Sequence, residues 1–159
     1  LFTVTYTALG GKLQAVLDTI AGLVERGIWV EVVTLVVPGL NDSPEEMKTI
    51  AAFLAGISPD IPWHVTAFHP DYQMTDPPAT PTRTLLTGAE IGRAAGLRYV
   101  YAGNLPGSVG TLEDTRCPSC GTTLVRRAGF TVLDVRLTPE GTCSSCGAAV
   151  AGVWSRTGA

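Results

Sequence analysis

The sequence predicts an α/β fold followed by a small β-rich module that contains four cysteines. Apolar, β-branched stretches alternate with helical patterns up to about residue 102, as in a βαβ series. All four cysteines then fall in two CxxC pairs after residue 116. Hydrophobic residues make up 45% of the 159-residue chain and charged residues 16%, a composition that favours a folded core over disorder.

The first predicted helix covers residues 13–26, where apolar side chains recur with a helical period. Gly27 follows at the position of a C-terminal cap. The next stretch, 28–37 (IWVEVVTLVV), is almost continuously apolar, which is typical of a strand buried on both faces of a parallel sheet. Glu31 interrupts this strand. Because a buried acid needs a partner or a proton, we expect Glu31 to be paired for structural reasons.

The second predicted helix has a complete start signal. Ser43 can cap it, Pro44 fits the first turn, and the Glu46 side chain can bond back to the Ser43 amide. The helix is expected to end near residues 55–56. A second buried strand follows at 63–68.

A proline-rich loop over 70–81 separates that strand from a third helix. Thr87 and Glu90 repeat the capping signature, which predicts a short helix ending at Gly96. A third strand then covers residues 98–102. The connections of such a βαβ series are right-handed, and ligands gather at the carboxyl ends of its strands.

The two CxxC pairs predict a metal site. Cys117 and Cys120 form one turn, Cys143 and Cys146 form the other, and a glycine after each pair lets the backbone curl around the sulfurs. Four thiolates make a soft tetrahedral site that suits zinc or a single iron. Structural zinc is favoured because most four-cysteine ribbons are structural, and a redox iron of rubredoxin type is the alternative.

The two histidines of the chain, His64 and His69, lie at the two ends of the second strand. Residues five apart on a strand point to opposite sides, so a shared metal is not expected. We expect His64 to be a buried, hydrogen-bonded structural residue. His69 lies at the carboxyl end of the strand, where position alone leaves a pocket role and a structural role equally open.

Charge and hydropathy argue against two classes of binding partner, nucleic acids and membranes. The net charge is −3, and no basic stripe offers a nucleic-acid surface. No apolar run reaches the roughly 18 residues needed to span a bilayer, and the first residues lack the features of a signal peptide. Together with the CxxC pairs, this favours a cytoplasmic protein without nucleic-acid or membrane partners. The sequence lacks an initiator Met and begins within a structural pattern, which suggests a fragment of a longer protein.

Several segments together resemble a known family: TLVVPGLNDSPEEM, PWHVTAFHPDYQMTDPPATP, GLRYVYAGNLPG, TRCPSCG and GTCSSCGAAVAGVW. They are similar to the later half of the radical SAM enzyme of the AmmeMemoRadiSam system, which is related to the activating enzymes of pyruvate formate-lyase. The resemblance covers nearly the whole chain. It implies the later half of a partial (β/α) barrel at 1–106, a linker at 107–115, a four-cysteine zinc-ribbon-like module at 116–154 and a tail at 155–159.

Enzymes of that family reductively cleave S-adenosylmethionine (SAM). A CxxxCxxC loop holds a four-iron four-sulfur cluster whose open iron binds SAM, and cleavage yields a 5′-deoxyadenosyl radical. This sequence contains no CxxxCxxC, so the resemblance implies that the chain alone is inactive and holds no catalytic residue. It also implies that Leu35, Thr66 and His69 lie beside the adenosyl group.

Other classes of function stay open at this point. One is a binding module whose ribbon and open sheet recruit a partner protein without chemistry. Another is a small electron carrier with iron at the four cysteines. No motif identifies a substrate, which is either a protein, by kinship with the activating enzymes, or a small molecule. Partner proteins of the same system are also implied by the resemblance.

Overall fold

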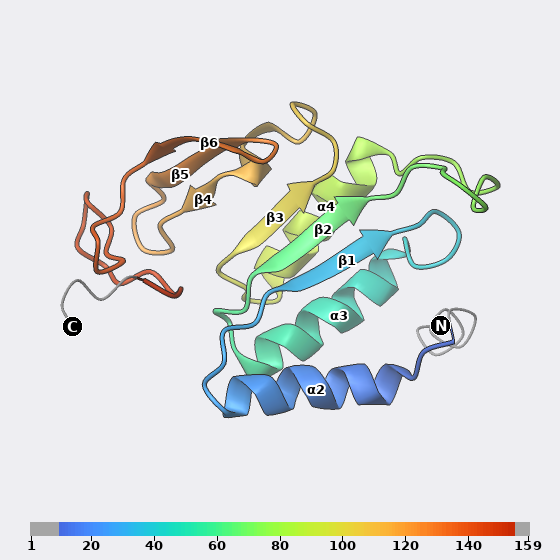
Figure 1. The fold of residues 1–159 in the computed structure, drawn as a ribbon, viewed down its shortest axis with the longest axis horizontal. Coiled ribbons are helices and arrows are strands. Elements are labelled where there is room, and N and C mark those ends of the chain that lie inside the picture. The colour runs from blue at the N-terminus through green and yellow to red at the C-terminus, as the bar shows by residue number, and fades with distance from the viewer. Residues whose placement is uncertain (1–9, 155–159) are drawn as a thin grey trace.

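The computed structural model describes residues 10–154, and the fold is given for these residues (Figure 1). Helices and parallel strands alternate first: α2 (Leu13–Glu25), β1 (Val32–Val36), α3 (Pro44–Ile57), β2 (Trp63–Ala67), α4 (Thr82–Ala94) and β3 (Val100–Gly103). A short 3-10 helix and antiparallel strands follow: η1 (Gly110–Glu113), β4 (Thr115–Arg116), β5 (Thr123–Ala128) and β6 (Thr131–Val135).

The strands form two sheets of different topology. β1, β2 and β3 pair in parallel in that order, and a helix connects each strand to the next. β4, β5 and β6 form an antiparallel meander. The predicted βαβ series and the β-rich module after it are therefore confirmed. Within residues 10–154, no helix is long and apolar enough to cross a membrane.

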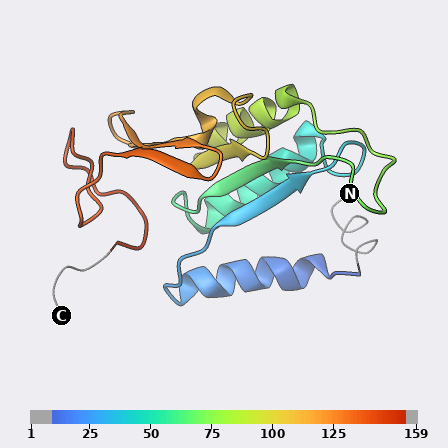
Figure 2. The same cartoon turned by 45° about the horizontal axis from the view of Figure 1, so that its top comes forward.

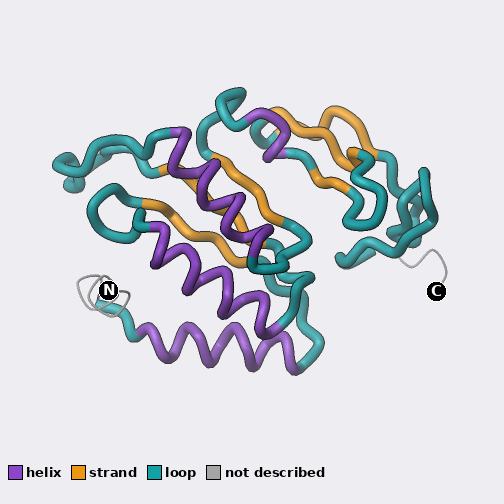
Figure 3. Tube along the Cα trace, turned by 180° about the vertical axis from the view of Figure 1, so that it is seen from behind, coloured by secondary structure: helices purple, strands orange, loops and turns teal. Residues whose placement is uncertain are grey.

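The helices cover one face of the parallel sheet. α3 and α4 lie side by side on this face, and α2 runs along the outer side of α3 (Figures 1 and 3). The core between helices and sheet contains fully buried Leu54 from α3, Leu85 from α4, and Trp63 and Val65 from β2. α2 has no buried residue, so it contributes least to this core. The opposite face of the sheet has no helix over it among the described residues.

Two glycines allow α4 to approach β2 closely. Gly88 and Gly92 lie on the buried face of α4. A Cβ atom at Gly92 would lie 2.8 Å from Cε3 of Trp63, and one at Gly88 would lie 3.0 Å from a methyl carbon of Val65. Because these distances are shorter than ordinary van der Waals contacts, the absence of a side chain sets the separation of helix and sheet.

The predicted strand at 28–37 is shorter than expected, and the prediction of burial on both faces is wrong. β1 begins at Val32, and Val33 and Leu35 are 64% and 47% exposed. Helices cover only one face of this sheet, so alternate side chains of β1 have no second layer to pack against. The apolar run indicated a strand correctly but did not reveal which of its faces is covered.

The start of α4 differs from the prediction. The helix begins at Thr82, directly after the N-cap residue Pro81, and not at Thr87. Leu85 and Ala89 are buried four residues apart on the same face. The Thr87–Glu90 signature therefore lies inside the helix, because the proline and the apolar spacing had already fixed an earlier start.

The predicted capping box at the start of α3 forms only in part. The amide of Glu46 donates a hydrogen bond to Oγ of Ser43 at 3.2 Å, as expected. The Glu46 carboxylate does not bond back, and it has no hydrogen-bond partner among the described residues. Burial raises the pKa of Glu46 and favours its protonated form.

The ribbon and the parallel sheet share side-chain contacts. The antiparallel sheet lies beyond β3, on the side away from β1 (Figure 2). Its core packs Leu124 and Val150 against Tyr99, the residue before β3. The amide of Ala151 also donates a hydrogen bond to the Tyr99 hydroxyl at 3.0 Å. Residues 107–115, expected as a linker, contain η1 and the first residue of β4.

Candidate functional site

The four predicted metal ligands meet in the ribbon. Their sulfur atoms all lie within 4.8 Å of one another. Sγ of Cys117 is 3.6 Å from Sγ of Cys146, and Sγ of Cys120 is 3.7 Å from Sγ of Cys143. These distances are far longer than the roughly 2.05 Å of a disulfide bond. The four side chains are therefore free thiols arranged around one point.

Two tight turns bring the sulfurs together. Gly121 and Gly147 have φ angles of 73° and 71°, a left-handed conformation that strains other residues. Their amides donate hydrogen bonds to the carbonyl oxygens of Cys117 at 2.9 Å and of Cys143 at 2.8 Å. The amide of Ser145 also donates to Sγ of Cys143 at 3.4 Å. The backbone thus both positions the sulfurs and favours their thiolate form.

The spacing of the sulfurs fits a tetrahedral metal ion. A metal–sulfur distance of about 2.3 Å places tetrahedral sulfurs about 3.8 Å apart, close to the distances observed. Hydrogen bonds with Thr122 lower the pKa of Cys120 to about 6. The amide of Ala148 favours the Cys146 thiolate, but the other three sulfurs and burial raise the pKa of Cys146 to about 12. The site can hold an ion such as zinc or iron, and this donor set suits both.

A cavity of about 790 Å³ lies between the open face of the parallel sheet and the ribbon. Its lining comes from the segment before β1, from β2 and β3, and from the ribbon. The volume is in the range of pockets that enclose small molecules. We call this space the sheet–ribbon cavity. Its polar lining residues include Glu31, His64, Tyr101, Thr115 and Arg127.

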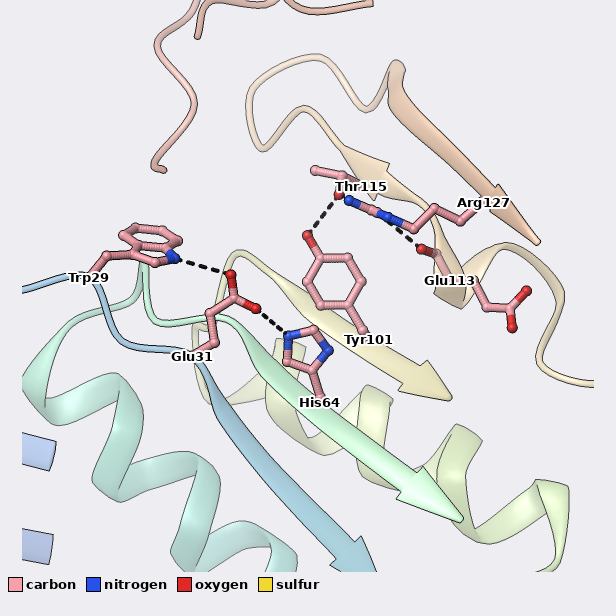
Figure 4. Close-up of polar contacts among 7 residues, drawn as sticks. All are labelled: Trp29, Glu31, His64, Tyr101, Glu113, Thr115 and Arg127. Carbon is pink, nitrogen blue, oxygen red and sulfur yellow. Dashed lines mark hydrogen bonds and ion pairs between the residues drawn. The ribbon is translucent and has the colours of Figure 1, made fainter. Parts of the chain in front are cut away.

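A carboxylate fixes the orientation of His64 in the sheet–ribbon cavity. Oε2 of Glu31 lies 2.8 Å from Nε2 of His64, and Trp29 Nε1 donates to Oε1 of Glu31 at 3.0 Å (Figure 4). Because the carboxylate accepts, Nε2 carries the proton, and Nδ1 of a neutral ring is left as an acceptor. Burial opposes ionisation of Glu31, but the hydrogen bonds from Trp29 and His64 and the positive charge of Arg127 lower its pKa.

Tyr101 connects His64 to the ribbon. Its ring stacks on the imidazole, with centroids 4.9 Å apart and planes inclined by 21°. Its hydroxyl lies 2.9 Å from Oγ1 of Thr115, which also accepts a hydrogen bond from Nη1 of Arg127 at 2.8 Å (Figure 4). The same Nη1 donates to the backbone carbonyl of Glu113 at 3.3 Å. Burial raises the pKa of Tyr101, so the phenol is protonated at neutral pH.

The residues expected beside the adenosyl group lie in two places. Leu35 and Thr66 are direct register partners on β1 and β2, and Thr66 pairs in turn with Gly103 on β3. This row crosses the open face near the carboxyl ends of the strands. His69 lies two residues beyond the end of β2, is exposed, and does not line the sheet–ribbon cavity. Its role beside SAM stays a prediction.

The predicted burial of His64 and Glu31 is wrong, although each has a hydrogen-bonded partner as expected, and each is the partner of the other. The His64 side chain is 31% exposed and that of Glu31 is 48% exposed, because both lie on the uncovered face of the sheet. Tyr101 and Arg127 were not recognised from the sequence. Tyr101 had one available signal, its place in the predicted strand at 98–102; in the structure it pairs directly with His64 across β2 and β3. No sequence signal pointed to Arg127, because it reaches the cavity from the ribbon.

The fold and the cysteine site define a mixed α/β protein with a four-cysteine metal-binding site. No protein-family profile matches the chain, and no solved structure matches it. The chain is similar to an uncharacterized protein of Methanocaldococcus jannaschii, with 40% identity over 137 residues. The match covers 85% of this chain but 40% of that protein, so the chain spans about two fifths of the length of this relative.

Proposed function

We propose that this chain is the carboxyl-terminal part of a radical SAM enzyme, with a structural zinc ion in its ribbon. The observation that carries the proposal is the one-sided cover of the parallel sheet. A doubly wound sheet has helices on both faces, whereas the strands of a (β/α) barrel carry helices only on the outside. α3 and α4 lie on one face of β1–β2–β3, as in a barrel segment (Figure 3).

The carboxyl edge of the sheet supports a ligand role. Asn41 holds the end of β1: its Nδ2 donates to the Leu35 carbonyl at 2.9 Å, and its Oδ1 accepts from the Val37 amide at 2.7 Å. Asn104 donates to the carbonyl of Ala67 at the end of β2 at 2.7 Å. Strand ends fixed in this way form a rigid edge, and ligands of parallel α/β folds bind at this edge.

The roles of the chain follow from this arrangement. Leu35 and Thr66 lie in one row on the open face and would contact the adenosyl group, with His69 at the edge beyond them. Cleavage itself requires a four-iron four-sulfur cluster, which supplies the electron. The four ribbon cysteines do not fit that cluster, because a tetrathiolate site leaves no open position for SAM. This chain would therefore bind and orient SAM rather than cleave it.

A reconstitution experiment tests the proposal. The coding sequence upstream of this chain is searched for CxxxCxxC, and the longer protein is reconstituted with iron and sulfide and reduced with dithionite. The expected result is 5′-deoxyadenosine from the longer protein and none from this chain alone. Serine variants of the upstream cysteines serve as the control. Absence of an upstream CxxxCxxC, or product from this chain alone, would contradict the proposal.

A further inference from the structure

We propose that the sheet–ribbon cavity binds a small carboxylic acid that also carries a hydrogen-bond donor. Arg127 receives the carboxylate, and Nδ1 of His64 accepts from the donor. The binding itself does not depend on radical chemistry. The identification of this ligand as the substrate of the enzyme does rest on the proposed function. It follows from Thr66, which would contact SAM and also lines this cavity.

Arg127 provides the cationic side of the site. It is half-buried, and within residues 10–154 only Nη1 of its guanidinium has hydrogen-bond partners, the Thr115 hydroxyl and the Glu113 carbonyl. Among the described residues, no carboxylate lies within ion-pair distance of its guanidinium. Asp114 accepts only from the Arg127 backbone amide, and the Glu113 side chain points away from the guanidinium (Figure 4). A planar guanidinium with unused donors suits a bidentate carboxylate.

His64 provides the accepting side. The Tyr101 ring stacks on one face of the imidazole and keeps its plane in place, and a turn of the ring within this plane would lose the hydrogen bond between Nε2 and Glu31. Nδ1 has no hydrogen-bond partner among the described residues and lies on the side of the ring away from Glu31 (Figure 4). An acceptor fixed in this way selects ligands that present an O–H or N–H group.

Both groups line the same cavity and lie beside the same ring, Tyr101. The Tyr101 ring centroid is 4.9 Å from the His64 centroid and 6.0 Å from Cζ of Arg127. Trp29 and Trp154 also line the cavity and add aromatic surface. A planar acid with its donor opposite the carboxylate matches this combination of charge, acceptor and aromatic wall.

The probe for this site is 4-hydroxybenzoate, titrated into the purified zinc-loaded chain by calorimetry. Two analogues are the controls: benzoate lacks the donor, and 4-hydroxybenzamide lacks the charge. The expected result is saturable binding of 4-hydroxybenzoate, with each analogue bound roughly ten-fold more weakly because one hydrogen-bonded contact is lost. Arg127→Gln should remove the preference over the benzamide, and His64→Phe should remove the preference over benzoate.

Arg126→Gln is the matched control, because Arg126 is the exposed neighbour of Arg127 and does not line the cavity. It should bind all three compounds like the unmodified chain. Melting temperature and zinc content show whether each variant folds. If Arg127→Gln does not fold, Arg127→Lys, which keeps the charge but not the planar fork, should reduce the preference for the carboxylate.

Three results would overturn the proposal: no saturable binding of the probe, equal binding of the benzamide, or an equal loss in Arg126→Gln. Probe binding without 5′-deoxyadenosine from the longer protein would keep this site and refute the radical SAM function. The reverse outcome would refute this site alone.

Discussion

The parallel-sheet part and the ribbon are stabilised by different interactions. The sheet part buries large apolar side chains completely, among them Trp63, Leu54 and Leu85. In the ribbon, Leu124 and Val150 are buried together with two of the cysteines, while Phe130 is fully exposed and Leu133 is 51% exposed. A module with so little core needs another source of stability, and a metal ion at four cysteines is one. The sheet part therefore folds around its apolar core, whereas the ribbon folds around its four-cysteine site.

Removal of the metal is the strongest test of this comparison. Chelation should unfold residues 115–154 and leave β1–β3 with α3 and α4 folded, because binding free energy at structural zinc sites is on the order of 10 kcal/mol and becomes folding free energy. Amide hydrogen exchange measured during chelator titration shows which amides lose protection. Tyr99 and Tyr101 contact the ribbon, so protection should also fall at the start of β3. Uniform loss across both parts would show a single cooperative unit.

The two candidate sites differ in how far the sequence revealed them. Both cysteine pairs are short local motifs, and CxxC geometry forces two sulfurs together in any chain that forms the turn, so the metal site was predictable. The sheet–ribbon cavity joins Glu31, His64 and Arg127 from segments far apart in the chain. Apolar periodicity placed the first two in predicted strands, although Glu31 lies one residue before β1, and it did not indicate which sheet face is covered. Arg127 depends on how the ribbon packs against β3, and no local pattern encodes that.

A glycine substitution tests the close packing between α4 and the parallel sheet. Gly92→Ala should destabilise the protein by about 1–3 kcal/mol, because overpacking a close contact outweighs the helix propensity gained. The added methyl group would meet the fully buried Trp63 at 2.8 Å. Urea unfolding measures the change. Gly56→Ala is the control: Gly56 lies on α3 with nothing within 4 Å of a Cβ, so its substitution should be neutral or stabilising. A loss for Gly56→Ala as large as for Gly92→Ala would contradict this account.

Alanine variants of the two histidines distinguish the carboxyl edge of the parallel sheet from the sheet–ribbon cavity. In the longer protein, His69→Ala should weaken SAM binding roughly ten-fold, about 1–2 kcal/mol, through loss of one hydrogen-bonded or stacked contact with adenine. Because His69 is exposed, its removal should leave the melting temperature unchanged. His64→Ala should spare SAM affinity, since His64 lies near the opposite end of β2. SAM dissociation constants for both variants test this assignment of SAM binding to His69. The roles are reversed if His64→Ala carries the larger loss of SAM affinity.

The smallest expected effect is the loss of folding stability at acid pH that comes from the Glu31–His64 pair. The pKa of Glu31 is lowered in the folded protein, so the pair stabilises the fold above pH about 4.5 and loses this contribution as the pH falls through the folded pKa. The hydrogen bonds from Trp29 and His64 and the positive charge of Arg127 favour the Glu31 carboxylate, and both side chains of the pair are partly exposed, so the effect should stay below about 1 kcal/mol. Urea unfolding between pH 3 and 7 should show a shallower pH dependence for Glu31→Gln than for the unmodified protein. Glu140→Gln, at an exposed acid outside the cavity, is the control and should retain the original slope. Identical pH profiles for Glu31→Gln and the unmodified protein would mean that the carboxylate orients His64 without stabilising the fold.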